Sequence, residues 1–177
     1  MRVLVYGFGP YKQLEDNITQ RVVRQLPRSR NIKKIVFPVR FDKKQFTSVV
    51  KRFRPDVILG LGQCSRGRRL RVEQRAANKK RNDKQERARP IVRGGPRWLP
   101  TTLMLGKSSL GKRAKISHDA GDYVCNFSMY VILDYLKHHD PAARFGFIHI
   151  PHGHNLKSAG RFVSRVLREV TNRPPER

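Results

Sequence analysis

The residue in this chain best suited to covalent chemistry is a cysteine at the start of a long apolar run. Cys125 lies in the segment AGDYVCNFSMYVILDYL, where a turn containing glycine precedes an expected helix. The thiolate is the reactive form of cysteine, and a helix N-terminus or a nearby cation favours that form. Cys125 is therefore a candidate nucleophile. The competing interpretation is a small buried hydrophobic residue, which is the commoner fate of a free cysteine.

A base for Cys125 would have to come from the six histidines of the chain. His149 alone lies inside an apolar strand pattern, FGFIHIP, and at the same sheet edge as a thiol it is a candidate general base. A carboxylate that orients the imidazole would complete such a set. Glu73, the one acid between Asp56 and Asp83, is the best candidate, and its competing role is a counter-ion to the surrounding arginines.

Other kinds of site fit the sequence less well. The segment HIPHGH brings together His149, His152 and His154, but their spacing is not that of a compact metal site. The segment GFGP lacks the third glycine of a dinucleotide-binding loop. Cys64 and Cys125 form no C-x-x-C motif. The sequence therefore predicts neither a metal nor a cofactor.

The order of apolar patterns along the chain indicates the fold. Strand and helix patterns alternate, which predicts a single-domain α/β/α sandwich with a mostly parallel, twisted sheet over residues 1–177. Sites in such folds gather at the carboxyl ends of the strands, here in the loops 7–13 and 62–73 and after residue 150. Strands are predicted at 2–7, 32–39, 55–62, 114–119 and 144–150, a strand-like segment at 71–77, and helices at 17–26, 41–53, 125–139 and 156–172.

The charge of the chain is its most unusual bulk property. Lys and Arg number 39 against 13 Asp and Glu, a formal net charge of +26. Thirteen of these cations and three acids fall within residues 66–97. Such a field attracts polyanions, so a nucleic acid is a candidate partner for this block. The alternative is a solvated basic loop, and the block offers no row of aromatic residues on which bases could stack.

Composition also bears on location. No apolar run approaches the roughly 18 residues of a membrane span, and the first residues, MRVLVYGFGP, do not resemble a secretory signal. Two cysteines are too few for a disulfide framework. We expect a cytoplasmic protein without a membrane partner.

Five segments, in order, resemble the pyroglutamyl peptidase I family, cysteine peptidases that remove an N-terminal pyroglutamate. They are RVLVYGFGPY, RPDVILGLGQ, RVEQRAAN, AGDYVCNFSMY and GFIHIP, and the last two are the most specific. The resemblance covers most of the chain and implies a phosphorylase/hydrolase-like fold. It also implies that Cys125 is the nucleophile, that His149 is the base and later the acid, and that Glu73 orients the imidazole.

The resemblance further implies how the lactam ring is bound. Phe8 and Tyr11 would form an aromatic clamp, with Tyr123 nearby. Gln63 and the backbone around Cys125 would support the ring or the oxyanion. Peptides with an N-terminal pyroglutamate are then the expected substrates.

The chain departs from the family pattern after Glu73. A basic loop insertion at about 65–98 contains KKRNDKQERAR where the family carries its active-site arginine, and Arg81 is the candidate substitute. The family often forms tetramers, so the resemblance also allows a homo-oligomer. The alternative function is a strongly basic nucleic-acid-binding protein on the same fold, with weak or lost peptidase activity.

Overall fold

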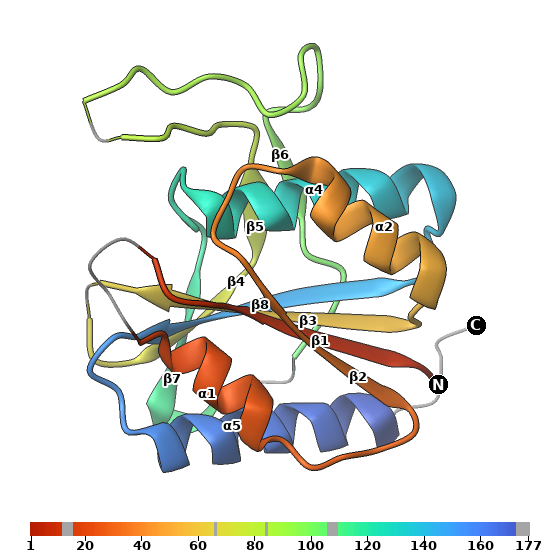
Figure 1. The fold of residues 1–177 in the computed structure, drawn as a ribbon, viewed down its shortest axis with the longest axis vertical. Coiled ribbons are helices and arrows are strands. Elements are labelled where there is room, and N and C mark those ends of the chain that lie inside the picture. Colours follow the sequence, from red (N-terminus) through yellow and green to blue (C-terminus); the bar gives the residue numbers. More distant parts are fainter. Residues whose placement is uncertain (12–15, 66, 84, 106–109, 173–177) are drawn as a thin grey trace.

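A six-stranded sheet lies between two layers of helices in the computed structural model, which describes residues 1–11, 16–65, 67–83, 85–105 and 110–172 (Figure 1). Neighbouring strands run parallel, except for β4 and β8, which are antiparallel. The predicted sandwich with a mostly parallel sheet is therefore confirmed. The sheet order is β2 (Ile32–Phe37), β1 (Val3–Phe8), β3 (Val57–Cys64), β8 (Arg144–Pro151), β4 (Leu70–Glu73) and β7 (Ala114–Ser117).

Two helices cover each face of the sheet (Figure 1). The Asn17 side chain caps the first helix by accepting a hydrogen bond of 3.0 Å from the backbone N–H of Thr19. Asp42 caps the second in the same way, so this helix begins two residues later than the apolar spacing predicts. No helix among the described residues is long and apolar enough to cross a membrane. One face carries α1 (Ile18–Gln25) and α5 (Leu156–Asn172), and the other carries α2 (Lys43–Phe53) and α4 (Val124–His139).

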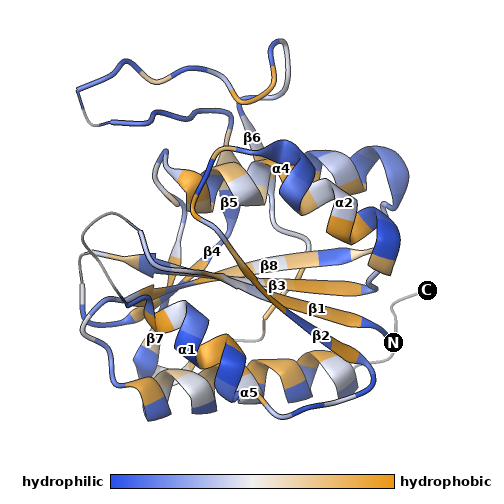
Figure 2. Ribbon diagram, in the orientation of Figure 1, coloured by the Kyte–Doolittle hydropathy of each residue, from blue (hydrophilic) through white to orange (hydrophobic). Residues whose placement is uncertain are grey.

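The sheet has an apolar core on each face, and Figure 2 shows the apolar strands between helices whose outer sides are polar. The core under α1 and α5 consists almost entirely of Val, Leu and Ile side chains. The core under α2 and α4 is rich in aromatic rings, namely Tyr6, Phe8, Phe37, Phe46, Phe127, Tyr130, Phe145 and Phe147. The candidate site lies on this aromatic face.

A smaller antiparallel pair of strands, β5 (Arg75–Ala77) and β6 (Trp98–Pro100), lies beside α4. The residues between them, 78–97, are called the basic arm below, and they project beyond the helical layer (Figure 1). Asn78 fixes the base of the arm, because its side chain bonds the backbone of residues 91, 92 and 95 at 2.8 to 3.2 Å. Pro96 precedes β6 and Pro100 ends it, which is why the sequence predicts no regular structure there.

Further out along the basic arm, Lys80 and Arg89 exchange two backbone hydrogen bonds of 2.7 and 2.8 Å. Parts of the predicted site loops and of the 66–97 block, residues 12–13, 66 and 84, lie outside the described residues. The strand-like segment 71–77 contains both β4 and β5, which are separated at Gln74.

Candidate active site

The register of β8 with its two neighbours determines the centre of the candidate site. His149 on β8 lies beside Gly62 on β3 and beside Arg71 on β4. Side chains alternate along a strand, so His149 shares the aromatic face with Phe147, whereas Ile148 faces the α5 layer. His149 therefore lies near the carboxyl ends of β3 and β8.

Glu73 contacts His149 through the antiparallel pairing of β4 with β8. Glu73 pairs directly with Phe147 and is thus a diagonal neighbour of His149 on the same face. Its Oε1 lies 2.8 Å from Nδ1 of His149, and the two residues are 0% and 5% exposed. A carboxylate on Nδ1 holds the ring orientation and leaves Nε2 as the nitrogen available to a second partner.

That second partner is Cys125. Burial alone lowers the pKa of His149, but hydrogen bonds to Cys125 and Glu73 outweigh burial and raise the pKa to about 9. The imidazole is therefore stabilised in its protonated form, between the Cys125 sulfur on one side and the buried Glu73 carboxyl group on the other.

Gly62 makes the space in which the sulfur lies. A Cβ atom at this position would be 2.7 Å from Cys125 Sγ and 2.7 Å from the Phe147 ring. Both distances are much shorter than an ordinary contact, so any larger residue would displace the thiol or the ring. Because Gly62 is paired with His149, this gap brings the sulfur next to the imidazole.

Cys125 is the second residue of α4, at an end of the helix that has free backbone donors. The first helical hydrogen bond runs from Phe127 N to Tyr123 O, at 2.9 Å. The N–H groups of Val124, Cys125 and Asn126 precede it and have no acceptor within the helix. The Tyr123 side chain provides no cap. This helix end therefore favours negative charge on the thiol or on an atom bound to it.

Two buried side chains of α4 hold Cys125 in position. Asn126 donates to the carbonyls of Ala77 and Lys79 and accepts from Ala77 N, at 2.8 to 2.9 Å. Ser128 donates to the Cys125 carbonyl at 2.8 Å, and its hydroxyl lies 3.0 Å from that of Tyr6. The start of α4 is thus fixed both to β5 and to β1.

The aromatic residues predicted to bind substrate do not all lie together. The rings of Tyr11 and Tyr123 are 5.4 Å apart, and both residues are half-buried. Burial, followed by the hydrogen bond with Tyr11, raises the pKa of Tyr123, so its hydroxyl stays neutral. Phe8 is 2% exposed and lies instead in the core, against Tyr6 and Phe46.

Gln63 has a structural contact that the sequence does not suggest. Its Oε1 accepts a hydrogen bond of 3.0 Å from the backbone N–H of Ile18, at the start of α1. Gln63 therefore connects the end of β3 to α1, one residue beyond the glycine that makes room for Cys125.

Arg81 lies close to the aromatic pair, at the start of the basic arm. Its Nε is 2.7 Å from Asp122 Oδ2, and its backbone N–H donates to the Asp122 carbonyl at 2.9 Å. Asp122 immediately precedes Tyr123. An ion pair thus holds the guanidinium beside the residue that precedes Tyr123.

The two histidines after β8 belong to a turn. His152 N donates to the Cys64 carbonyl and His154 N to the Pro151 carbonyl, both at 2.9 Å. Among the described residues, no group of three or more His, Cys, Asp or Glu side chains is placed to hold a metal.

Sequence reasoning missed the residues that position the site. Gly62, Ser128 and Tyr6 carry no chemical motif, and their roles depend on contacts between β1, β3 and α4. One signal was available, because two glycines in the apolar strand VILGLGQ indicate a close approach of another chain segment.

Comparison with known proteins shows the family to which the chain belongs. The sequence profile of the pyroglutamyl peptidase family matches residues 1–156. A pyrrolidone-carboxylate peptidase of Coprothermobacter proteolyticus is 30% identical over 168 residues, which cover 85% of this chain and 81% of the relative. That of Alkaliphilus oremlandii is also 30% identical, with 86% and 79% covered.

Solved structures share the fold. Pyroglutamyl peptidase I of Bacillus amyloliquefaciens superposes with a TM-score of 0.83 at 25% identity, covering 93% of this chain and 94% of that one. A mutant pyrrolidone carboxyl peptidase of Pyrococcus furiosus gives a TM-score of 0.84 at 24% identity, covering 95% and 97%. Profile, relatives and fold agree along nearly the whole chain, so the protein belongs to the pyroglutamyl peptidase family of cysteine peptidases.

Proposed function

We propose that the protein hydrolyses the amide bond after an N-terminal pyroglutamyl residue, with Cys125, His149 and Glu73 as its catalytic residues. The observation that carries the proposal is the buried contact of 2.8 Å between Glu73 and His149, on an imidazole that also bonds Cys125. Nucleophile, base and orienting carboxylate then form the sequence of contacts that acyl transfer requires.

In the first half of the reaction, the Cys125 sulfur attacks the pyroglutamyl carbonyl carbon. A C–S bond forms, and the carbonyl electron pair moves to oxygen. The His149 imidazolium then gives its proton to the leaving amide nitrogen. The C–N bond breaks, and the shortened peptide leaves as an amine with a thioester on Cys125. Glu73 stabilises the imidazolium until that proton is transferred.

In the second half, water enters the place of the departed amine. Neutral His149 accepts a proton from the water, whose oxygen attacks the thioester carbon. The C–S bond breaks, the sulfur leaves as a thiolate, and pyroglutamate is released. The imidazolium and thiolate are restored together, which returns the enzyme to its starting form.

The first amides of α4 are suited to stabilise the oxyanion of both steps. The backbone N–H groups of Val124, Cys125 and Asn126 have no helical acceptor, and the attacked carbon is bound to the sulfur of the middle residue. Fixed donors of this kind lower the barrier because charge develops where they already point. The bonds of Asn126 to residues 77 and 79 keep this end of α4 from moving.

The lactam ring would bind beside Tyr11 and Tyr123, whose faces offer apolar area close to the sulfur. Phe8 would support this wall from the core behind it. Gln63 has its carbonyl oxygen on Ile18, so its amide NH2 is the end that would donate to the lactam carbonyl. Such hydrogen bonds would reject free glutamate, whose charge and open chain do not match them.

Turnover of a pyroglutamyl fluorogenic amide under reducing conditions tests the proposal. The wild type should release the fluorophore, and Cys125→Ala should lose essentially all activity. Cys64→Ala is the matched control, because it removes the other cysteine and should keep activity. Iodoacetamide should label Cys125 and abolish turnover in parallel. Full turnover by Cys125→Ala, or none by the wild type, would overturn the proposal.

A further inference from the structure

Several cations of the 66–97 block stabilise the protein itself. Arg81 pairs with Asp122 at 2.7 Å. Lys80 Nζ lies 5.6 and 5.3 Å from the ring centres of Phe41 and Phe127, within the range of cation–π attraction. These contacts hold the base of the basic arm against the start of α4. Lys80 and Arg81 therefore have partners within the protein, although the sequence suggests a nucleic acid as the partner of their block.

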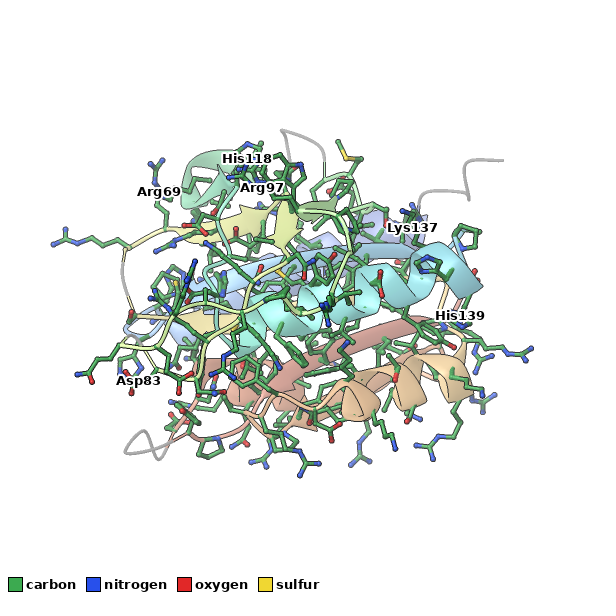
Figure 3. All side chains as sticks on the ribbon, turned by 90° about the horizontal axis from the view of Figure 1, so that it is seen from above. Arg69, Asp83, Arg97, His118, Lys137 and His139 are labelled. Carbon is green, nitrogen blue, oxygen red and sulfur yellow. The ribbon has the colours of Figure 1, made fainter. Side chains whose placement is uncertain are left out.

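The other end of the arm is similar. The guanidinium groups of Arg75 and Arg97 lie 4.7 and 4.8 Å from the ring centre of Trp98. Figure 3 shows Arg97 beside His118, and both line a hollow next to Trp98. Arg75 Nε also donates to the His118 carbonyl at 2.9 Å. Arg75 and Arg97 thus pack against the partly exposed Trp98 ring. These contacts favour a structural role for this cluster rather than a role in binding a partner.

A different surface also gathers cations, and one of them, Arg165, lies 5.4 Å from the ring centre of Phe162. A hollow of about 660 Å³ lies where α1 and α5 adjoin, and its floor includes Leu26 and Phe162. Its cations are Arg113, Lys157, Arg161, Arg165 and Arg168. None of its described lining residues is acidic. Together these residues are called the α1–α5 groove below.

The spacing of these cations follows from the helix. Lys157, Arg161 and Arg165 are four residues apart, so they recur on one side of α5 about every 6 Å. Arg113 faces them from the 3₁₀ turn before β7. Glu169 is four residues from Arg165 on the same helix and is its natural neighbour. The argument therefore depends on the other four cations, whose side chains are exposed.

We infer that the α1–α5 groove binds the phosphodiester backbone of a nucleic acid. Cations spread along α5 from Lys157 to Arg168 suit a chain of repeated anions better than one compact ion. Arginine and lysine heads are hydrogen-bond donors only, and phosphate oxygens are acceptors only, so the two surfaces satisfy one another. The groove has no row of aromatic side chains, so binding should not depend on base sequence.

Two other polyanions fit the groove less well. A bilayer would need apolar side chains to insert, but the apolar side of α5 is already buried against the sheet through residues such as Val163 and Val166. An acidic peptide carries backbone N–H donors. The Lys and Arg side chains of the groove are themselves donors only, so they could not pair with those N–H groups. The groove is also concave, and a flat surface would reach fewer of its cations.

The groove and the candidate active site lie on opposite faces of the sheet. α5 packs on the aliphatic core, whereas Cys125 and His149 lie on the aromatic face under α4. The protein could therefore bind a nucleic acid and a peptide at once, and variants in the groove leave the proposed catalytic residues intact.

Fluorescence anisotropy with labelled 20-nucleotide oligomers tests the inference, using single-stranded DNA, single-stranded RNA and a DNA duplex. Contact with about four phosphates predicts that raising salt from 50 to 200 mM weakens binding about 10²-fold. The triple variant Lys157→Glu, Arg161→Glu, Arg168→Glu should bind at least about tenfold more weakly than the wild type at 50 mM salt and show a shallower salt dependence.

The matched control is Lys44→Glu, Lys51→Glu, Arg52→Glu on α2, which changes the net charge equally on the other layer. It should stay within about threefold of the wild type, because screening limits the reach of distant charges. Circular dichroism and turnover of the pyroglutamyl amide verify that each variant is folded. Should the glutamate variant unfold, glutamine at the same three positions removes the charges with less repulsion.

The outcomes separate the inference from its rivals. Equal losses in the two triple variants would assign binding to the overall charge and overturn the groove. Tighter groove-dependent binding of polyglutamate or of anionic vesicles than of oligomers would overturn the nucleic-acid assignment. Binding of single strands or of the duplex, lost selectively in the groove variant, supports it, and the preferred oligomer identifies the strand form.

Discussion

The two faces of the sheet differ in the side chains that they bury. Under α1 and α5 the core consists almost entirely of Val, Leu and Ile side chains, and the buried polar residues there, Asn17 and Thr19, bond each other at the start of α1. Under α2 and α4 the core consists of aromatic rings, and among them lie the buried polar groups Glu73, His149 and Ser128. Strand β3 contributes to both faces, with Leu61 on the first and Gly60 and Gly62 on the second.

This difference shows how a reactive group is accommodated in a packed core. Aliphatic side chains interlock and fill the space between sheet and helix, so their face stabilises the fold without leaving a gap. Aromatic rings are rigid, so on the other face glycines in β3 leave the space that the rings occupy. A Cβ on Gly60 would lie 2.4 Å from the Phe147 ring and 2.6 Å from the Tyr6 hydroxyl. The same kind of gap, at Gly62, holds the Cys125 sulfur beside His149.

After removal of the nucleophile itself, the largest effect on the aromatic face should come from Glu73→Gln, which keeps the shape but removes the charge. We expect kcat to fall about 10²- to 10⁴-fold, because the amide no longer stabilises the imidazolium. Since the pKa of His149 is raised to about 9, its protonated form persists below that pH and is lost above it. The alkaline limb of the kcat/KM profile should therefore shift to lower pH in the variant.

Glu86→Gln, an exposed change of the same kind on the basic arm, is the control for this measurement. Its pH profile should match that of the wild type. An unshifted alkaline limb in Glu73→Gln would mean that the carboxylate does not act on the imidazole.

The next largest effect should come from Gly62→Ala. The added methyl group must displace Cys125 Sγ or the Phe147 ring by about 1 Å, and such a misplacement costs about 10²-fold in kcat. Gly160→Ala makes the same change in α5, where a Cβ meets no atom within 4 Å. It should keep activity and raise the free energy of unfolding by about 0.5 to 1 kcal/mol. Equal activity in both variants would contradict the proposed gap.

Leu61→Ala changes the residue next to Gly62 but on the aliphatic face. Leu61 is fully buried, so its truncation should lower the free energy of unfolding by about 2 to 5 kcal/mol, measured by urea denaturation. Turnover per folded molecule, counted by titration of the reactive thiol, should stay close to that of the wild type. A large loss of kcat at full folding would show that the two faces are not separable in this way.

The contrast between these neighbours also shows what sequence can and cannot predict. Leu61 is predictable as core, because the period and composition of VILGLG specify a buried strand. The sandwich, its mostly parallel sheet and the helix that begins near Cys125 follow from the same local patterns. Motif resemblance then points to Cys125, His149 and Glu73, although no local pattern places them within reach of one another.

What the sequence leaves out depends on the register between distant strands. Glu73 reaches His149 only because β4 is antiparallel to β8, a direction that the alternating pattern of strands and helices does not predict. Phe8 is a second example. Its motif suggests a substrate contact, but its position in β1 turns the ring into the core. Both outcomes follow from pairings between residues far apart in the chain.

The smallest effect we expect on the aromatic face is that of the hydrogen bond between Tyr6 and Ser128, which is 3.0 Å long and buried. Burial raises the pKa of Tyr6, so its hydroxyl remains a neutral donor, and Ser128 passes the contact to the Cys125 carbonyl. Tyr6→Phe and Ser128→Ala should each lower the free energy of unfolding by about 1 kcal/mol. A double-mutant cycle should give a coupling of about 0.5 to 1.5 kcal/mol. If the same cycle in kcat also shows coupling, this network positions the nucleophile, because a purely structural bond would alter stability without altering turnover.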